Sequence, residues 1–253
     1  MRPRCRFLRF EGLAMPYLAL VRHGQSQWNL ENRFTGWMDV NLTAEGEAQA
    51  RKAGQLLKSS GVGFSRAFTS LQTRAIRTLW LALEEMDCCW LPEEKSWCLN
   101  ERHYGALTGL DKAETMAKHG EDQVRIWRRS YDVPPPPQLK SDPFHPVHDL
   151  RYQHVPAGAL PDGESLAMTL ARVLPYWSAS IAPHLKQESL VISAHGNSLR
   201  AIIKHLFALD EEQIMEVEVP TANPLLIELD AALKPISAKY LDASRAQPLP
   251  VIG

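Results

Sequence analysis

The sequence predicts an α/β fold with a mostly parallel central sheet that is flanked by helices on both faces. Short apolar runs alternate along the chain with amphipathic segments of helical periodicity. The runs are nearly continuous in apolar residues, as in parallel strands that are covered on both sides. With 253 residues, the chain is long enough for one large domain or two small ones with a sizeable core.

The first half of the chain opens this alternation. Residues 17–21 form an uninterrupted apolar run and are the first predicted strand. After a polar loop, residues 43–58 predict a helix, because Thr43 can cap its N-terminus and the apolar side chains share one face. Residues 66–69 are the second predicted strand.

The pattern continues with a helix over about residues 72–85 and a third strand near residues 96–99. Residues 166–185 predict a long helix, in which Pro175 is expected to introduce a kink. A further strand is expected at residues 189–193, so strands and helices alternate as in parallel α/β units.

The expected organisation is a single domain over residues 15–242. A helical and loop insertion at about 102–161 interrupts the alternation, since this segment is rich in Pro and His and has little periodicity. Residues 1–14 are a non-core extension without the apolar stretch of a secretory signal, and Met15 is the expected start of translation. The extension is then either an artefact of upstream translation or a loose arm. Residues 243–253 form a short C-terminal tail.

Composition excludes several classes of protein. The net charge is −1, and the body of the chain lacks the basic excess of a protein that binds nucleic acid. The longest apolar runs, at 18–21 and 225–227, suit buried strands and are far shorter than the ~20 residues that cross a membrane. The four cysteines form no CxxC pair, which favours a reducing cytoplasm.

Two histidines follow the ends of predicted strands. The strand at 17–21 leads directly into Arg22, His23 and a glycine, and the strand at 189–193 leads to His195 and another glycine. Ligands of open α/β sheets bind at the carboxyl ends of the strands, and glycine lets the backbone approach them closely. Two histidines in matching positions therefore predict a ligand site.

Cationic side chains indicate an anionic ligand. A neutral imidazole can attack phosphorus, and nearby cations offset the charge of the group that is transferred. Arg22 adjoins His23, and Arg74 lies in the first turn of a predicted helix, where the helix N-terminus favours the same anion. Lys112, Arg128 and Arg129 lie in the insertion and can close over the site.

Glu101 follows the third predicted strand and should lie near the same edge of the sheet. Aromatic neighbours such as Trp97 and Tyr104 can raise the pKa of a carboxyl group, which would let it exchange a proton with a hydroxyl. An ion pair with Arg102 is the alternative, and sequence position leaves both open.

The motifs that carry this chemistry also occur together in a known family. In chain order they are Leu20–Asn29 (LVRHGQSQWN), Arg33–Trp37 (RFTGW), Thr69–Ala75 (TSLQTRA), Leu99–Leu107 (LNERHYGAL), Trp127–Arg129 (WRR) and Ala194–Arg200 (AHGNSLR). From about residue 16 to residue 241, the chain closely resembles the cofactor-dependent phosphoglycerate mutases of the histidine phosphatase superfamily.

The resemblance implies the histidine phosphatase fold and a cytoplasmic enzyme of glycolysis and gluconeogenesis. It would interconvert 2- and 3-phosphoglycerate through a phosphohistidine, primed by 2,3-bisphosphoglycerate without a metal. By the same resemblance, His23 carries the phosphoryl group, Glu101 exchanges a proton with the substrate hydroxyl, and His195, Arg22 and Arg74 stabilise the transfer. The implied substrate-binding residues are Asn29, Thr35, Gly36, Tyr104, Lys112, Arg128, Arg129, Gly196 and Asn197. A homo-oligomer, either a dimer or a tetramer, is also implied.

The resemblance has two gaps. Many mutases continue after this point into a mobile tail, rich in Lys and Ala, over the site, whereas this chain ends thirteen residues after Tyr240. A shorter tail leaves the phosphoenzyme more open to water, so measurable bisphosphatase activity is expected. Residues 138–162 match the family only loosely.

Three other readings remain. A bisphosphoglycerate mutase or phosphatase, or a broad-specificity histidine phosphatase, would share the histidines and arginines. The broad phosphatase would not need the block at 101–104 or the basic insertion. The hypothesis from a different functional class is a metal-binding module around His145, His148 and His154. It is disfavoured because no cysteine accompanies the three histidines and their spacing fits no standard finger.

Overall fold

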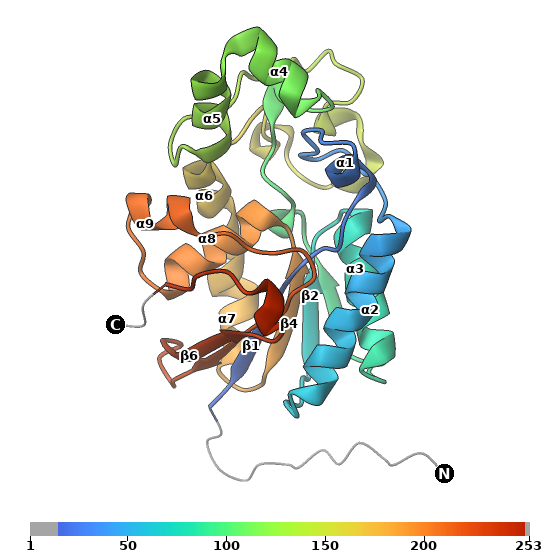
Figure 1. The fold of residues 1–253 in the computed structure, drawn as a ribbon, viewed down its shortest axis with the longest axis vertical. Helices are drawn as coiled ribbons and strands as arrows, with labels where there is room; N and C mark the ends of the chain where they lie inside the picture. Colours follow the sequence, from blue (N-terminus) through green and yellow to red (C-terminus); the bar gives the residue numbers. More distant parts are fainter. Residues whose placement is uncertain (1–14, 251–253) are drawn as a thin grey trace.

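The computed structural model describes residues 15–250, so the expectation for residues 1–14 and the end of the expected tail lie outside it. A six-stranded sheet fills the centre of the molecule, helices cover both of its faces, and the insertion lies beyond one end of the strands (Figure 1). In spatial order the strands are β3 (Glu93–Lys95), β2 (Arg66–Thr69), β4 (Leu190–Ala194), β1 (Tyr17–Arg22), β5 (Leu225–Leu229) and β6 (Pro235–Tyr240).

The sheet is mixed. Strands β3, β2, β4 and β1 run parallel to one another, whereas β5 pairs with β1 in the antiparallel direction and β6 pairs with β5 in the same way. The predicted α/β class is therefore confirmed, with the parallel strands forming the part of the sheet from which His23 and His195 emerge.

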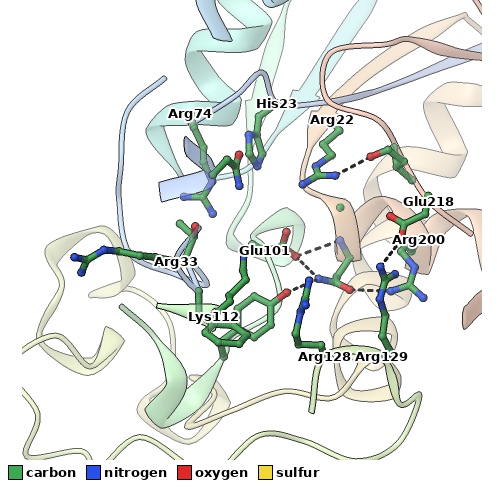
Figure 2. A pocket seen from close by; sticks show the side chains of 17 residues that line it. Arg22, His23, Arg33, Arg74, Glu101, Lys112, Arg128, Arg129, Arg200 and Glu218 are labelled. Carbon is green, nitrogen blue, oxygen red and sulfur yellow. Dashed lines mark hydrogen bonds and ion pairs between the residues drawn. The ribbon is translucent and has the colours of Figure 1, made fainter. Parts of the chain in front are cut away.

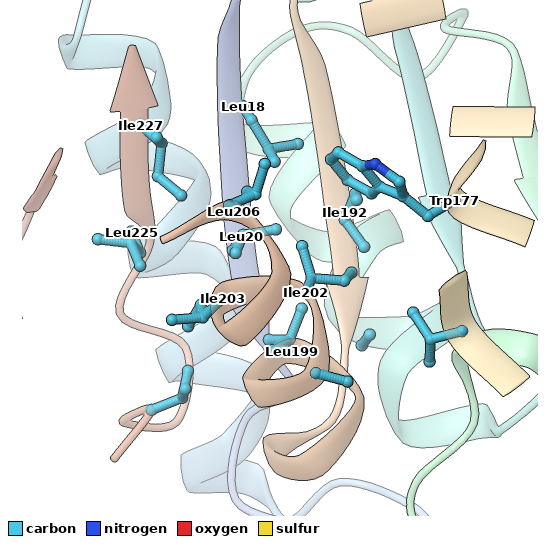
Figure 3. Packing of buried hydrophobic residues seen from close by; sticks show 14 of the residues in the cluster. Leu18, Leu20, Trp177, Ile192, Leu199, Ile202, Ile203, Leu206, Leu225 and Ile227 are labelled. Atoms are coloured by element: carbon cyan, nitrogen blue, oxygen red, sulfur yellow. The ribbon is translucent and has the colours of Figure 1, made fainter. Parts of the chain in front are cut away.

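Strand β1 shows how the core is divided between the two faces. Leu18 and Leu20 point to the face covered by helices α6 (Leu166–Tyr176) and α8 (Gly196–Leu206), and both side chains are fully buried (Figure 3). Its other apolar residues join the core on the opposite face. Side chains alternate between the faces of a strand, so a run that is apolar at every position requires cover on both sides.

Helices α2 (Ala44–Ser59) and α3 (Thr73–Glu85) cover that opposite face (Figure 1). As predicted, Thr43 caps α2, because its hydroxyl oxygen accepts a hydrogen bond from the Gly46 N–H at 3.0 Å. These two helices begin at the same end of the sheet as the carboxyl ends of the parallel strands (Figure 1).

The third predicted strand is wrong in its position. Residues Trp97–Leu99 form a 3₁₀ turn that begins at Ser96, whose hydroxyl accepts the Cys98 N–H. The strand in this region is β3, three residues earlier, with the polar sequence Glu-Glu-Lys. A strand at the edge of a sheet buries little side-chain surface, so apolar content does not locate it.

The long predicted helix consists of three parts. Helix α6 contains Pro175 and ends at Tyr176, a π-helical turn follows over Trp177–Ile181, and α7 (Ala182–Leu185) completes the segment. Proline lacks the N–H of a regular helix, and the π-helical turn begins two residues after Pro175.

The segment expected as an insertion holds short helices and turns beyond the carboxyl ends of the parallel strands (Figure 1). Its helices are α4 (Lys112–His119) and α5 (Glu121–Arg129), and 3₁₀ turns occur at Gly105–Leu107, Pro146–His148, Leu150–Tyr152 and Ala157–Ala159. The remaining elements are α1 (Gln27–Leu30), α9 (Glu211–Glu216) and a 3₁₀ turn at Ala243–Arg245. No helix within residues 15–250 combines the length and apolar character needed to cross a membrane.

Candidate active site

A cavity of about 140 Å³ lies between the insertion and the carboxyl ends of β1 and β4 (Figure 2). Most of the predicted site residues line it. These are Arg22, His23, Asn29, Thr35, Arg74, Glu101, Tyr104, Lys112, Arg128, Arg129, Gly196 and Asn197. The two predicted residues that do not line it, His195 and Gly36, lie behind its wall and hold residues that do.

His23 follows the last residue of β1, and its side chain points into the cavity between Arg22 and Arg74 (Figure 2). The ring Nδ1 lies 2.7 Å from the carbonyl oxygen of Gly24. A carbonyl oxygen only accepts, so Nδ1 carries the hydrogen and Nε2 keeps its lone pair. Burial, together with Arg74 and Arg22, holds the pKa of His23 well below 6.5, so the imidazole is neutral at pH 7.

His195 lies behind His23 as the N-cap residue of α8, and the centres of the two rings are 5.0 Å apart. Its Nε2 is 2.8 Å from the hydroxyl of Ser70, and its Nδ1 is buried without a hydrogen-bond partner among the described residues. The Ser70 oxygen also accepts the N–H of Gln72, and its own hydrogen can be donated to Nε2; in that tautomer Nδ1 carries the imidazole hydrogen. Burial and nearby Arg74 hold the pKa of His195 well below 6.5.

Backbone carbonyls fix the two arginines beside His23. Arg22 donates from Nη1 to the Val219 oxygen at 2.8 Å, and Arg74 donates from Nη2 to the Gly36 oxygen at 2.9 Å. Gly36 therefore positions Arg74 and is not itself part of the cavity wall. Burial lowers the pKa of Arg74 to about 10, which still leaves it charged at pH 7.

The buried Nε atoms of Arg22 and Arg74 have no partner within residues 15–250. Buried N–H groups are nearly always hydrogen-bonded in native proteins. Together with Nδ1 of His195, these donors fit an anionic ligand in the cavity.

Glu101 presents one oxygen to the protein and one to the cavity. Its Oε1 accepts hydrogen bonds from the backbone N–H of Arg102 at 2.7 Å and from both the backbone and side-chain amides of Asn197. Its Oε2 makes no hydrogen bond in the described part of the chain and faces Gly196, where an added Cβ would lie 3.8 Å away. The ion pair between Glu101 and Arg102 does not form, because the Arg102 side chain contacts the Arg128 carbonyl and the Tyr104 ring.

Arg172 on α6 holds the backbone that precedes Glu101. Its guanidinium donates to the carbonyl oxygens of Trp97, Cys98, Asn100 and Glu101 and forms a buried ion pair with Glu164 at 2.7 Å. A rigid helix thus fixes a segment that has no regular structure of its own.

The insertion supplies the opposite wall. Burial favours the neutral phenol of Tyr104, but Arg102 outweighs this effect and the pKa of Tyr104 is lowered. Burial also lowers the pKa of Lys112, which lies over the Phe34 ring. Arg128 and Arg129 reach the cavity from the last turn of α5.

Five lining residues were not predicted from the sequence: Arg33, Phe34, Arg200, Glu218 and Val219. Arg200 lies on α8 three residues after Asn197 and donates to its side-chain oxygen at 3.1 Å, so helical spacing from Asn197 was an available signal. Glu218 and Val219 belong to a loop after α9 that has no distinguishing motif.

The cavity is strongly cationic. Seven arginine or lysine side chains line it against two carboxylates, those of Glu101 and Glu218. Such a site suits a small molecule that carries several negative charges. Elsewhere in the described chain, His145 contacts Asp162 and His148 contacts the Lys140 carbonyl, and no group of three or more His, Cys, Asp or Glu residues within 15–250 is placed to hold a metal ion.

Comparison with known families and relatives gives consistent matches. The profile of the histidine phosphatase superfamily (branch 1) matches residues 18–147 and 144–236. A 2,3-bisphosphoglycerate-dependent phosphoglycerate mutase of Caulobacter sp. (strain K31) is 63% identical over 241 residues, covering 94% of this chain and 100% of the relative. A protein of the same name from Hyphomonas neptunium is 61% identical over 237 residues, covering 93% and 99% of the two chains.

Solved structures share the fold at lower identity. A mycobacterial glucosyl-3-phosphoglycerate phosphatase in complex with VO₃ superposes with a TM-score of 0.67 at 21% identity, covering 89% of this chain and 97% of that one. An Escherichia coli protein described as a putative α-ribazole-5′-P phosphatase gives 0.65 at 21% identity, covering 94% and 99%.

Proposed function

Because the chain belongs to the histidine phosphatase superfamily and, within it, to the 2,3-bisphosphoglycerate-dependent phosphoglycerate mutases, we propose that it interconverts 2- and 3-phosphoglycerate in glycolysis and gluconeogenesis. The observation that carries the proposal is that a neutral His23 and the carboxylate of Glu101 both line a cationic cavity, and that hydrogen bonds from the protein hold only one oxygen of this carboxylate. One group is suited to accept a phosphoryl group and the other to move a proton.

His23 Nε2 attacks phosphorus, so that a P–N bond forms while the P–O bond to the substrate oxygen breaks. Glu101 Oε2 gives a proton to the oxygen that leaves, and in the reverse direction it takes the proton from the attacking hydroxyl. Nδ1 of His195 and the guanidinium groups of Arg22 and Arg74 donate hydrogen bonds to the transferring phosphoryl oxygens.

The remaining cationic side chains bind the part of the substrate that does not react. Lys112, Arg128 and Arg129 lie across the cavity from His23 and suit the carboxylate and second phosphate of a phosphoglycerate. When bound, 2,3-bisphosphoglycerate supplies the phosphoryl group that primes His23. Its several negative charges fit the unpartnered N–H groups of Arg22, Arg74 and His195.

The test is conversion of 3-phosphoglycerate to 2-phosphoglycerate in excess EDTA, with and without a trace of 2,3-bisphosphoglycerate, while phosphate release is followed in the same tube. We expect conversion that survives EDTA and rises with the bisphosphate. Phosphate release without isomerisation would instead assign the pocket to a phosphatase, and release alongside isomerisation would measure its bisphosphatase activity.

Two variants test the assigned roles. His23→Ala should take no stable label from 2,3-bisphosphoglycerate, and stable labelling would refute the phosphohistidine. Glu101→Gln keeps the hydrogen-bonding shape but cannot carry the proton, so isomerisation should fall by a factor of about 10² or more. If Glu101→Gln isomerises at the wild-type rate, the proton is moved by another group.

We also propose that the protein is a cytoplasmic homo-oligomer. In its dimer, the surface around the edge strand β3 would pack against the same surface of a second copy of the chain. Trp80 on α3 is 51% exposed and lies along the edge strand β3, where its Nε1 donates to Glu93 at 3.0 Å. Trp90, just before β3, is 60% exposed. An edge strand flanked by exposed tryptophans favours association.

A further inference from the structure

One carboxylate in the cavity is joined to one of its cations. Glu218, in the loop between α9 and β5, forms an ion pair with Arg129 at the end of α5 (Figure 2). The two side chains are 47% and 41% exposed, and both line the cavity. The pair therefore links the insertion to the opposite side of the opening.

The other charged groups of the cavity are arranged differently. Glu101 is held by N–H donors and, within residues 15–250, forms no ion pair. Lys112 and Arg128 contact no carboxylate among the described residues, and the guanidinium of Arg200 donates to Asn197 and to the Ile214 carbonyl. Arg33 pairs with Glu31 at 3.2 Å, but Glu31 does not line the cavity. Among the described residues, Arg129 is thus the cavity cation that forms an ion pair with a carboxylate of the cavity wall before any ligand enters.

We propose that Glu218 is a specificity-determining residue that competes with the ligand for Arg129. An entering phosphate or carboxylate competes with Glu218 for the N–H groups of this guanidinium, and the Glu218 charge repels the ligand in proportion to the ligand's own charge. Glu218 therefore weakens binding of a bisphosphate more than binding of a monophosphate. The choice of phosphoglycerates as ligands rests on the proposed function, whereas the competition itself concerns any phosphate.

The competition has a modest expected size. An exposed ion pair changes an equilibrium by about twofold to fivefold. Removing the Glu218 charge should therefore lower the dissociation constant for 2,3-bisphosphoglycerate by about that factor, with a smaller change for 3-phosphoglycerate.

The experiment uses the full chain with His23→Ala throughout, so that binding is measured by calorimetry without phosphoryl transfer. Glu218→Gln removes the charge and keeps the size of the side chain. Glu216→Gln is the matched control, because Glu216 is exposed two residues away, loses the same charge and does not line the cavity. We expect Glu218→Gln to bind more tightly than the His23→Ala parent and Glu216→Gln to bind with the affinity of that parent. Equal affinities in the two variants would overturn the proposal.

A double-mutant cycle with Arg129→Gln identifies the route of the effect. If Glu218 acts by occupying Arg129, Glu218→Gln should have little effect once Arg129 is replaced. A full effect in the Arg129→Gln background would contradict competition for this guanidinium.

Titration with inorganic phosphate separates the two proposals. Failure to bind phosphoglycerates counts against the proposed function. The competition is still supported if Glu218→Gln tightens the binding of inorganic phosphate when Arg129 is present and not when Arg129 is replaced.

Discussion

Burial and two arginines keep the His23 imidazole neutral at pH 7, which a nucleophile requires. Because the pKa of His23 lies well below 6.5, the side chain should still be mostly unprotonated at pH 6.5, where an ordinary imidazole is half protonated. The rate at which 2,3-bisphosphoglycerate labels the enzyme should therefore stay nearly constant between about pH 7.5 and 6.5. Rapid-quench labelling measures this rate, and a decline centred near pH 6.5 would show that the imidazole has its ordinary pKa.

A second histidine links pH to stability. Burial lowers the pKa of His103 to about 4, whereas the unfolded side chain titrates near 6.5. The unfolded state then binds more protons between these values, so the contribution of His103 is complete above pH 6.5 and is lost as the pH falls towards 4.

The free energy of unfolding should accordingly fall below pH 6.5, by at most about 1.4 kcal/mol per pH unit for this residue. Urea unfolding at several pH values measures the slope. His103→Gln, which retains an acceptor for the Gly105 N–H, should show a shallower slope than the wild type. Identical slopes would mean that His103 does not contribute.

Sequence reasoning found the site residues that belong to motifs at strand ends, such as His23 and Arg74, because a strand fixes where its last residue points. It did not find Glu218 or Val219. The Val219 carbonyl holds Arg22 across a separation of 197 residues, and only the folded chain brings the two together. The assignment of Gly36 to the ligand stays a prediction, and the structure adds that the Gly36 oxygen holds Arg74.

Among the elements, helix α2 packs directly on the loop that carries His23. A Cβ added at Gly46 would lie 2.0 Å from the Gln25 carbonyl oxygen, a distance that no side chain tolerates. Gly46→Ala should therefore cost about 1–3 kcal/mol of stability and slow His23 phosphorylation by shifting its loop. Thermal unfolding and labelling measure the two effects.

The matched control is Gly158→Ala, since nothing lies within 4 Å of a Cβ at Gly158. This variant should be close to the wild type in both stability and labelling. Equal behaviour of the two alanine variants would argue against the close approach of α2 to the loop.

Helix α6 reaches the site through the ion pair between Arg172 and Glu164. Arg172→Met leaves Glu164 buried without its partner and should cost about 3–5 kcal/mol. The double variant Arg172→Met with Glu164→Gln removes that charge and should regain part of the stability, as urea unfolding would measure. Its isomerisation should stay slow, since the carbonyls before Glu101 have lost their donor. Full recovery of activity would refute a positioning role for Arg172.

Elements were predictable where burial determines the sequence. Strands β1, β2 and β4 lie inside the sheet and have apolar sequences, so the expected ranges differ from the observed ones by a residue at most. Strands β3 and β6 lie at the edges and carry polar or exposed residues, so the expected third strand was misplaced and β6 was not expected. The π-helical turn after Pro175 depends on packing that a sequence pattern does not contain.

For the whole molecule, the proposed dimer can be tested through Trp80. Trp80→Ser removes an exposed aromatic side chain beside β3 and should shift the protein towards monomer in sedimentation velocity. Leu30→Ser is the control, because Leu30 is also exposed, at 63%, and belongs to α1, which is not part of the face formed by α3 and β3. If both variants sediment as the wild type does, this face does not mediate association.

The position of β4 in the sheet determines when the enzyme becomes competent during its synthesis. β4 pairs with β2 on one side and with β1 on the other, although it follows both by more than a hundred residues. A chain still on the ribosome that lacks β4 also lacks β5 and β6, which follow it, so β1 has no partner strand and β2 pairs with β3 alone. Such a chain also lacks His195, so phosphoryl transfer has to wait until β4 has been made and has joined the two parts of the parallel sheet.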